Sequence, residues 1–288
     1  MNIVVCVKEV FDTEGLVQID QKADCIKGSL PRVINPLDLL AVEEAVRLKE
    51  AHGDVQVTLL CMGPPSAKRA LQSCLAIGAD RGMILWDIAF AGSDSYATGV
   101  ILAKAIQSIP HDLIICGQEA IDTKAGFVWA VIAELLDIPV VSRVIRTEVS
   151  LSGRKITAYR KLEKGNREIV EAPLPAVVVI ETGLIKVRYP TVRAIMVAKR
   201  KDIAEYDGKA LGLHLNEVGE AGSKARVISL SKPKAKGLFT PDSSLSAAER
   251  LRLVMVGGLT ERKTEGLQGD IDDMTTKFVQ FLDEHKFI

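Results

Sequence analysis

The chain has 288 residues and equal numbers of basic and acidic residues (37 Lys and Arg, 37 Asp and Glu), so its formal net charge is zero. A neutral chain has no overall field to attract nucleic acid or an anionic membrane, and 5% aromatic residues are too few for a base-stacking platform. The 48% hydrophobic content excludes a disordered chain, and the length indicates one large domain or two small ones.

The first half of the chain, up to about residue 145, alternates apolar strands with helices. Asn35-Pro36 predicts the N-cap and first turn of a helix that ends near Gly53, in which Glu43 is expected to pair with Arg47. Each predicted strand is continuously apolar, as parallel strands covered on both faces are. The strands are predicted at 3–7, 55–62, 83–85 and 113–116, and further helices at 66–77, from Ser93 or Asp94 onward, and at 126–136.

The second half changes character. A hairpin is predicted over 156–172, turning at 164–166, and a buried strand over 174–180. Residues 183–201 are irregular and basic, and 202–245 are rich in Gly, Pro, Ser and Lys, which predicts an extended arm. Helices are expected at 246–256 and 270–284.

Strands that alternate with helices predict an α/β fold, with a doubly wound, mainly parallel, Rossmann-like sheet. The predicted organisation is an α/β domain over 1–201, which includes the loop at 183–201, and an extended C-terminal arm over 202–288. A long arm with little core of its own usually wraps around something else.

The cysteines and the N-terminus bear on the cellular compartment. Five cysteines, an odd number with no C-x-x-C pair, fit neither a disulfide framework nor a zinc site. The N-terminus MNIVVCVKEV does not resemble a signal peptide, and no apolar run reaches the roughly 18 residues of a membrane span. We therefore expect a reduced, soluble, cytoplasmic protein.

A search for catalytic motifs assigns no catalytic residue and no metal ligand. The sequence lacks G-x-G-x-x-G after the first strand, a P-loop, an H-E-x-x-H helix and a G-x-S-x-G elbow. The four histidines fall at predicted helix ends or in loops. Acid–base chemistry by the chain's own side chains is therefore disfavoured.

The loops after the apolar strands are unusual. They read VKEVFDT, CMGPPSA, DIAFAGSDSYATG and GQEAIDTKAG. In a doubly wound sheet, ligands bind at this edge, and small residues that lead into a helix N-terminus offer N–H groups suited to phosphate. Ordinary turn chemistry accounts for any one of these loops, whereas their joint arrival at one edge indicates a nucleotide pocket.

The sequence also resembles the beta (small) subunits of electron-transfer flavoproteins. Five motifs match in order and spacing over residues 1–203: VCVKEVFDT, INPLDLLAVEEAVRLKE, GADRG, GQEAID and LPAVVVIETGLIKVRYPTVRAIMVAKRK. The resemblance implies a subunit that pairs with a larger alpha subunit, with FAD at their junction. It also implies electron transfer between dehydrogenases of the acyl-CoA dehydrogenase type and a membrane quinone reductase or, in electron-bifurcating members, ferredoxin and NADH.

The resemblance further implies a second nucleotide in the sheet of this subunit. That nucleotide is AMP in housekeeping members and a second FAD in bifurcating members. The contacts carried over from the family are Cys6, Asn35, Pro36, Leu37, Asp38, Met62, Gly117, Gln118, Asp122, Thr123 and Lys124.

The loop DIAFAGSDSYAT is similar to the bifurcating pattern F-x-G-x-D-x-x-A-T, which makes Phe90, Gly92, Asp94, Ala97 and Thr98 candidate FAD contacts. The chain departs from that pattern after Asp122. Where the family has Gly-Asp-Thr-Ala-Gln-Val-Gly-Pro, residues 123–130 read TKAGFVWA. Lys124 could replace polar phosphate contacts with a charge, and Trp129 could instead crowd the pocket. The match favours FAD, and AMP stays open.

Residues 183–201 are similar to the family's recognition loop, which docks acyl-CoA dehydrogenases. Val192 stands where the family has an anchoring leucine, and one methylene less removes about 0.8 kcal/mol of apolar burial, so a different or weaker partner is expected. Without the resemblance, this stretch reads as a solvated basic loop. The candidate docking residues are Arg188, Tyr189, Val192, Ile195 and Met196.

Two other functions compete with the electron carrier. A stand-alone adenine-nucleotide-binding regulator of the universal-stress type predicts a chain of about half this length. An adenylating enzyme needs an S-G-G-x-D-like loop after the first strand, where this chain has VKEVFDT. The long arm and the recognition-like loop favour the electron carrier.

Overall fold

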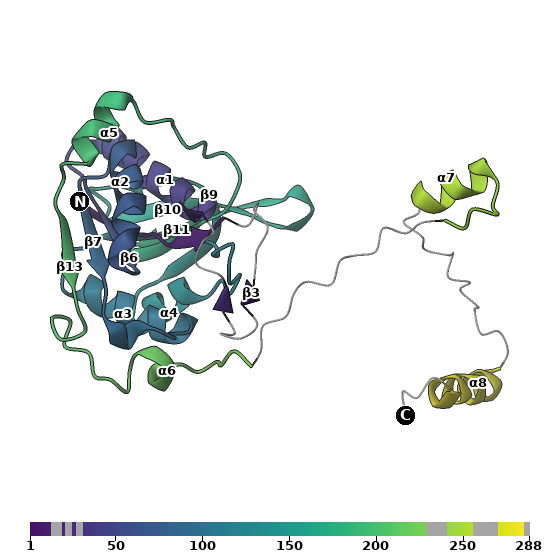
Figure 1. Cartoon of the computed structure of the whole chain (residues 1–288). Coiled ribbons are helices and arrows are strands. Elements are labelled where there is room, and N and C mark those ends of the chain that lie inside the picture. Colours follow the sequence, from purple (N-terminus) through teal and green to yellow (C-terminus); the bar gives the residue numbers. More distant parts are fainter. Residues whose placement is uncertain (13–18, 21–24, 27–30, 229–240, 256–269, 285–288) are drawn as a thin grey trace. The chain divides into compact units, whose positions relative to one another are not determined.

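A nine-stranded sheet organises the first part of the molecule. In this computed structural model the strands lie in the order β11-β10-β9-β12-β8-β1-β6-β7-β13 (Figure 1). All pairs from β9–β12 to β7–β13 are parallel, and β9–β10 and β10–β11 are antiparallel. The strands are β1 (Asn2–Cys6), β6 (Gln56–Met62), β7 (Arg81–Leu85), β8 (Leu113–Gly117), β9 (Val140–Ser150), β10 (Lys155–Lys161), β11 (Arg167–Pro173), β12 (Ala176–Ile180) and β13 (Ile203–Tyr206).

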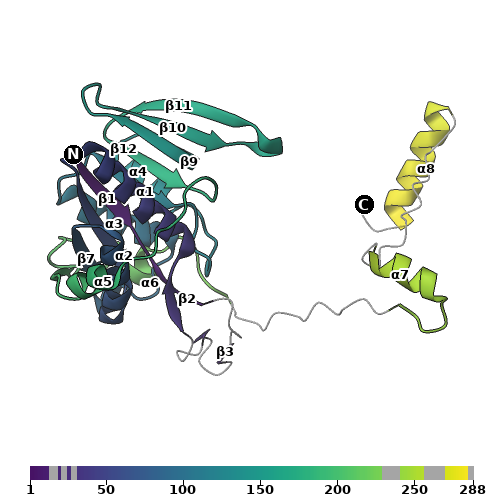
Figure 2. The same cartoon turned by 90° about the horizontal axis from the view of Figure 1, so that it is seen from above.

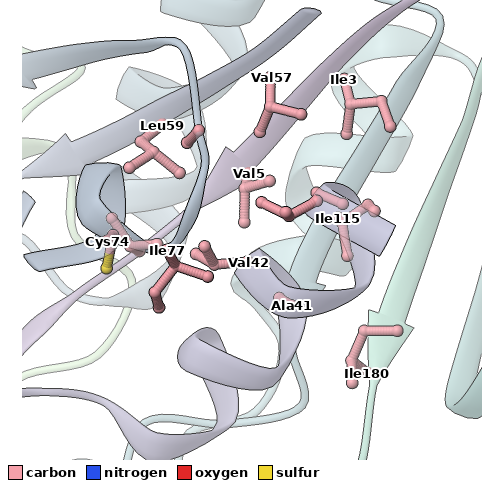
Figure 3. Packing of buried hydrophobic residues seen from close by; sticks show 14 of the residues in the cluster. Ile3, Val5, Ala41, Val42, Val57, Leu59, Cys74, Ile77, Ile115 and Ile180 are labelled. Atoms are coloured by element: carbon pink, nitrogen blue, oxygen red, sulfur yellow. The ribbon is translucent and has the colours of Figure 1, made fainter. Parts of the chain in front are cut away.

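Helices cover both faces of this sheet, which confirms the predicted doubly wound α/β fold. The first hydrophobic core lies under α1 (Pro36–His52), α2 (Lys68–Ile77) and α5 (Val192–Ala198). The second lies under α3 (Ser95–Gln107) and α4 (Val128–Leu136), with the short α6 (Gly219–Gly222) beside α3. In Figure 3, Val5 and Ile115 of neighbouring strands pack toward Ala41 and Val42 of α1.

The structure describes residues 1–12, 19–20, 25–26, 31–228, 241–255 and 270–284. Two small antiparallel pairs follow β1 in the chain: β2 (Glu9–Phe11) with β5 (Arg32–Ile34), and β3 (Ile19–Asp20) with β4 (Cys25–Ile26).

Strand β9 and helix α5 are the longest elements that were not predicted; the short strands β2 to β5 and β13 and the short helix α6 were not predicted either. The sequence indicates no strand over β9, because its apolar residues do not alternate regularly. In the structure, the pairing of β9 with β12 shifts register near Val178, and Arg143 adopts a left-handed φ of 60°. Residues 192–198 form α5, capped by the Thr191 hydroxyl, rather than irregular chain. The predicted hairpin is present as β10 and β11, which Figure 2 shows extending beyond the helices.

The structure divides into units Met1–Lys232 and Pro233–Ile288, whereas the sequence predicted a boundary at 201. The first unit extends further because β13 pairs with β7, and Leu211 and Val218 are buried in the second core. The second unit contains α7 (Ala247–Met255) and α8 (Ile271–Glu284), which coincide with the two helices expected there. Among the helices the structure describes, none has both the length and the apolar character needed to cross a bilayer.

Candidate functional site

The strand order reverses between β1 and β8, and ligands of doubly wound sheets bind at this point. Val5 of β1 is level with Ile115 of β8, so Cys6 and Gly117 end neighbouring strands at one edge. The first turn of α1 approaches the end of β8 closely, since a Cβ on Gly117 would lie 2.3 Å from Asp38 Oδ1. Only glycine permits this approach.

Asp38 is a buried carboxylate at the centre of this edge. Its Oδ2 accepts a hydrogen bond from the Lys8 backbone N–H (2.8 Å), and its Oδ1 accepts one from Asn35 Nδ2 (2.9 Å). Burial raises the pKa of Asp38 to about 7, although the hydrogen bonds from Asn35 and Lys8 and the Lys8 charge act in the opposite direction. A group that is half ionised near neutral pH therefore lies under the loop that follows β1.

Asn35 is the N-cap residue of α1 and Pro36 begins the helix, as predicted, but the Asn35 side chain makes no capping hydrogen bond. Its Nδ2 also donates to the Glu119 carbonyl (2.9 Å), and its Oδ1 accepts from the Ile121 N–H (3.1 Å). The side chain is 1% exposed and fully engaged with protein partners. Asn35 and Asp38 thus join the loops after β1 and β8, and we call these two residues the edge staple.

Charged side chains line the rim above the staple. Lys8 Nζ lies 2.9 Å from Asp122 Oδ1, an ion pair that links the same two loops on the solvent side. Lys124 is exposed and adopts a left-handed φ of 49°. Asp122 and Lys124 were among the predicted site residues, whereas Lys8 was not; its only signal in the sequence is its position at the end of the first strand.

Trp129 supports the root of the loop after β8. Its indole N–H donates to the Gln118 carbonyl (3.0 Å), while the Gln118 side chain accepts from the Arg143 backbone N–H (3.3 Å). Trp129 and Arg143 were not among the assigned site residues, and no motif in the sequence marks this pairing.

The FAD loop predicted from F-x-G-x-D-x-x-A-T lies at the same edge, two strands from β1, between β7 and α3. Phe90 is buried in the second core, and Ala97 is also buried. Asp94 caps α3, because its side chain accepts a hydrogen bond from the Ala97 N–H (2.9 Å). Gly92 is exposed and Thr98 half-buried. The loop therefore offers mostly backbone and small side chains to a ligand.

The other predicted nucleotide contacts lie around the staple. Cys6 and Met62 are half-buried at the ends of β1 and β6, on the side of the second core. Pro36 is exposed and Leu37 half-buried in the first turn of α1. The Thr123 backbone N–H donates to Asp122 Oδ1 (2.7 Å).

Arg188 was predicted as a docking residue, but its side chain is bound to α1, whereas the other four predicted docking residues are exposed. Its Nε lies 2.9 Å from Glu43 Oε1 and its Nη2 2.9 Å from Glu50 Oε2, so it ties the loop to α1. The hydrogen bonds that Arg188 donates to Glu50 and Glu43 raise its pKa. The expected Glu43–Arg47 pair is wrong, because Arg47 binds Glu44 instead. The exposed face consists of Tyr189 (98% exposed), Val192, Ile195 and Met196.

Arg188→Gln is expected to lower the free energy of unfolding by about 1 kcal/mol, because it leaves two carboxylates without their partially exposed cation. Tyr189→Ser removes an exposed side chain and is expected to leave stability unchanged within about 0.5 kcal/mol. Urea unfolding of the full chain measures both. Equal stabilities of the two variants would contradict an anchoring role for Arg188.

Comparisons with known proteins agree with this architecture. The electron transfer flavoprotein domain family matches residues 25–211. The chain belongs to this family. It is 40% identical to "Electron transfer flavoprotein subunit beta" of Thermoanaerobacterium thermosaccharolyticum, over 83% of this chain and 92% of the relative. The resemblance to beta subunits of this family, predicted from the motifs, is thereby confirmed.

Two further relatives carry more specific names. "Acryloyl-CoA reductase electron transfer subunit gamma" of Anaerotignum propionicum is 35% identical over 97% of this chain and 100% of the relative. "Caffeyl-CoA reductase-Etf complex subunit CarD" of Acetobacterium woodii is 35% identical over 82% of this chain and 90% of the relative.

Proposed function

We propose that this beta subunit pairs with an alpha subunit, binds FAD at their junction and passes electrons between an acyl-CoA dehydrogenase-type enzyme and an acceptor. The acceptor is a quinone reductase or, if the complex bifurcates electrons, ferredoxin. The observation that carries this proposal is the match, over 97% of this chain, to a subunit named for electron transfer in an acryloyl-CoA reductase. The isoalloxazine supplies the redox chemistry, and the protein binds and orients it.

A second nucleotide is proposed at the edge between β1 and β8. The rim there carries Lys8 and Lys124, whose charges suit phosphate. Helix α4 begins after Phe127, which has no side-chain acceptor. The N–H groups of Ala130 and Val131 donate to the Phe127 carbonyl, so those of Val128 and Trp129 are the ones proposed to meet an anion. The donor set fits the phosphates of either AMP or FAD. The loop between β7 and α3 favours FAD, because its pattern is the bifurcating one.

Docking of partners is proposed at two places. The exposed apolar side chains of Tyr189, Val192, Ile195 and Met196 are suited to a dehydrogenase. The arm is proposed to pack on the alpha subunit, because its helices carry exposed apolar side chains: Leu251, Val254 and Met255 on α7, and Phe278 and Val279 on α8. We place the complex in the cytoplasm.

Co-expression with an alpha-subunit gene tests the proposal. The purified heterodimer is expected to show a flavin spectrum, and its flavin content decides the second nucleotide. Two FAD per heterodimer support the bifurcating type, whereas one FAD with AMP released on denaturation supports the housekeeping type. A colourless monomer that binds only ATP would overturn the proposal in favour of the stand-alone regulator.

A further inference from the structure

Segment 219–225 lies against the loop between β7 and α3 through reciprocal hydrogen bonds. The backbone N–H groups of Lys224 and Ala225 donate to Asp94 Oδ2, at 2.8 and 2.7 Å. In return, the Asp94 backbone N–H donates to the Ser223 hydroxyl oxygen at 2.8 Å. The Gly219 N–H donates to the Ser93 hydroxyl oxygen at 2.9 Å. The Ser223 hydroxyl also donates to the Gly92 carbonyl oxygen at 3.2 Å, so five hydrogen bonds join two segments that are 126 to 131 residues apart in the chain.

The two backbones also approach each other closely. A Cβ on Gly219 would lie 2.5 Å from the Ala89 carbonyl oxygen, and Gly219 adopts a φ of +61°. Both features require glycine. The Lys224 ammonium lies 5.3 Å from the centre of the Tyr96 ring, which adds a cation–π contact on the outside of the junction.

The Asp94 carboxylate is fully engaged by these contacts. Its Oδ1 accepts from the Ala97 N–H, which caps α3, and its Oδ2 receives both donors from the segment. Partial burial raises the pKa of Asp94, but the N–H donors of Ala97, Ala225 and Lys224 outweigh this effect and the pKa lies below its usual value. A ligand hydroxyl could reach Oδ2 only by displacing charge-assisted hydrogen bonds.

We propose that Asp94 is the clasp that holds segment 219–225 on the α/β unit, and that it acts in the complex as a positioning residue rather than as a flavin ligand. The clasp fixes the stretch of chain that leads into Pro233–Ile288. The following consequence rests on the proposed function. If that C-terminal unit packs on an alpha subunit, a fixed starting point raises its effective concentration there and strengthens the heterodimer.

Asp94→Asn distinguishes the two roles of this side chain, which are to hold segment 219–225 and to cap α3. Asparagine is as good an N-cap as aspartate, so α3 keeps its acceptor for the Ala97 N–H. The amide nitrogen, however, replaces Oδ2 and would face the two N–H donors of Lys224 and Ala225. Ser223→Ala is the matched variant on the other side, because it removes the hydroxyl contact to the Asp94 N–H and leaves the carboxylate intact.

The primary measurement is residue-resolved amide hydrogen exchange on the full chain. Both variants are expected to raise the exchange rates of Lys224 and Ala225 by about 10-fold or more, because charge-assisted hydrogen bonds are lost or weakened. The double variant is expected to add little to D94N, since the two residues act in one contact network. Unchanged exchange at these amides in D94N would overturn the proposal.

The heterodimer supplies the second measurement. Both variants are expected to weaken association with the alpha subunit, and both assembled heterodimers are expected to keep the wild-type flavin content and visible spectrum. Loss of flavin in D94N but not in S223A would make Asp94 a flavin ligand and overturn the positioning role. If the wild-type chain forms no flavin heterodimer, the proposed function fails, and the exchange rates of the full chain still decide on the clasp.

Discussion

Gly117→Ala is expected to lower the free energy of unfolding of the α/β unit by about 3 kcal/mol, at the upper end of ordinary overpacking effects. The added Cβ would lie 2.3 Å from Asp38 Oδ1 and 2.9 Å from both the Asp38 nitrogen and the Leu37 carbonyl carbon. Two of these atoms are backbone atoms in the first turn of α1, so no side-chain rotation relieves the clash. The helix must move away from β8, which stretches the staple contacts of Asn35 and Asp38.

Gly63→Ala is the matched control for this experiment. Gly63 follows the neighbouring strand β6 at the same edge, but a Cβ there would lie 3.5 Å from Ala67 Cβ, an ordinary van der Waals distance. Urea unfolding of the full chain, followed by circular dichroism, compares the two variants. If the Gly117→Ala and Gly63→Ala variants have equal free energies of unfolding, the result contradicts the close approach of α1 to β8.

The second large effect concerns pH. Asp38 has a pKa of about 7 in the folded chain and about 3.9 in an unfolded one. Between pH 4 and 7 the folded state therefore keeps a proton that the unfolded state has lost. Stability from this group is complete below about pH 4 and falls as pH rises, by up to about 1.4 kcal/mol per pH unit. The total is about 4 kcal/mol, and the slope ends above pH 7.

Asp38→Asn removes this titration, so the difference in stability between wild type and variant isolates it. The wild type is expected to lose stability relative to D38N steadily from pH 4 to 7. Urea midpoints at half-unit pH steps measure the difference. A constant difference across this range would mean that Asp38 is ionised throughout. Nucleotide release measured over the same pH range shows whether ionisation of the staple also loosens the proposed site.

The parallel strands β1, β6, β7, β8 and β12 were predictable because they contain continuous apolar runs, as burial on both faces requires. Strand β13, whose sequence is IAEY, lacks such a run and was not predicted. Helices α3 and α4 were predictable for a similar reason, since Asp94 offers a local cap and small residues precede Val128. Strand β9 was not, because its pairing changes from parallel on one side to antiparallel on the other. A strand in that position shows neither the continuous apolar run of a buried parallel strand nor the strict alternation of an antiparallel strand with one solvated face.

The candidate site was predictable only as a set of loops that meet at one edge. The roles of individual side chains depend on partners distant in the chain. Asn35 resembled a local cap, yet it binds residues 84 and 86 positions away. Glu43 had a helical partner four residues on, yet it binds Arg188, 145 residues away. Helical spacing identifies which residues of the same helix can interact. It carries no information on partners that lie far away in the chain.

The exposed apolar side chains around α5 belong to a segment that starts from β12, in the middle of the sheet, and ends at β13, on its far edge. These strands are five spacings apart, roughly 24 Å at the usual distance between strands. Both ends are built into the sheet, and Arg188 ties the segment to α1 between them. Most of its conformational entropy is therefore lost on folding. A protein that binds there loses little further entropy by ordering it, so modest apolar contacts suffice for rapid, reversible association.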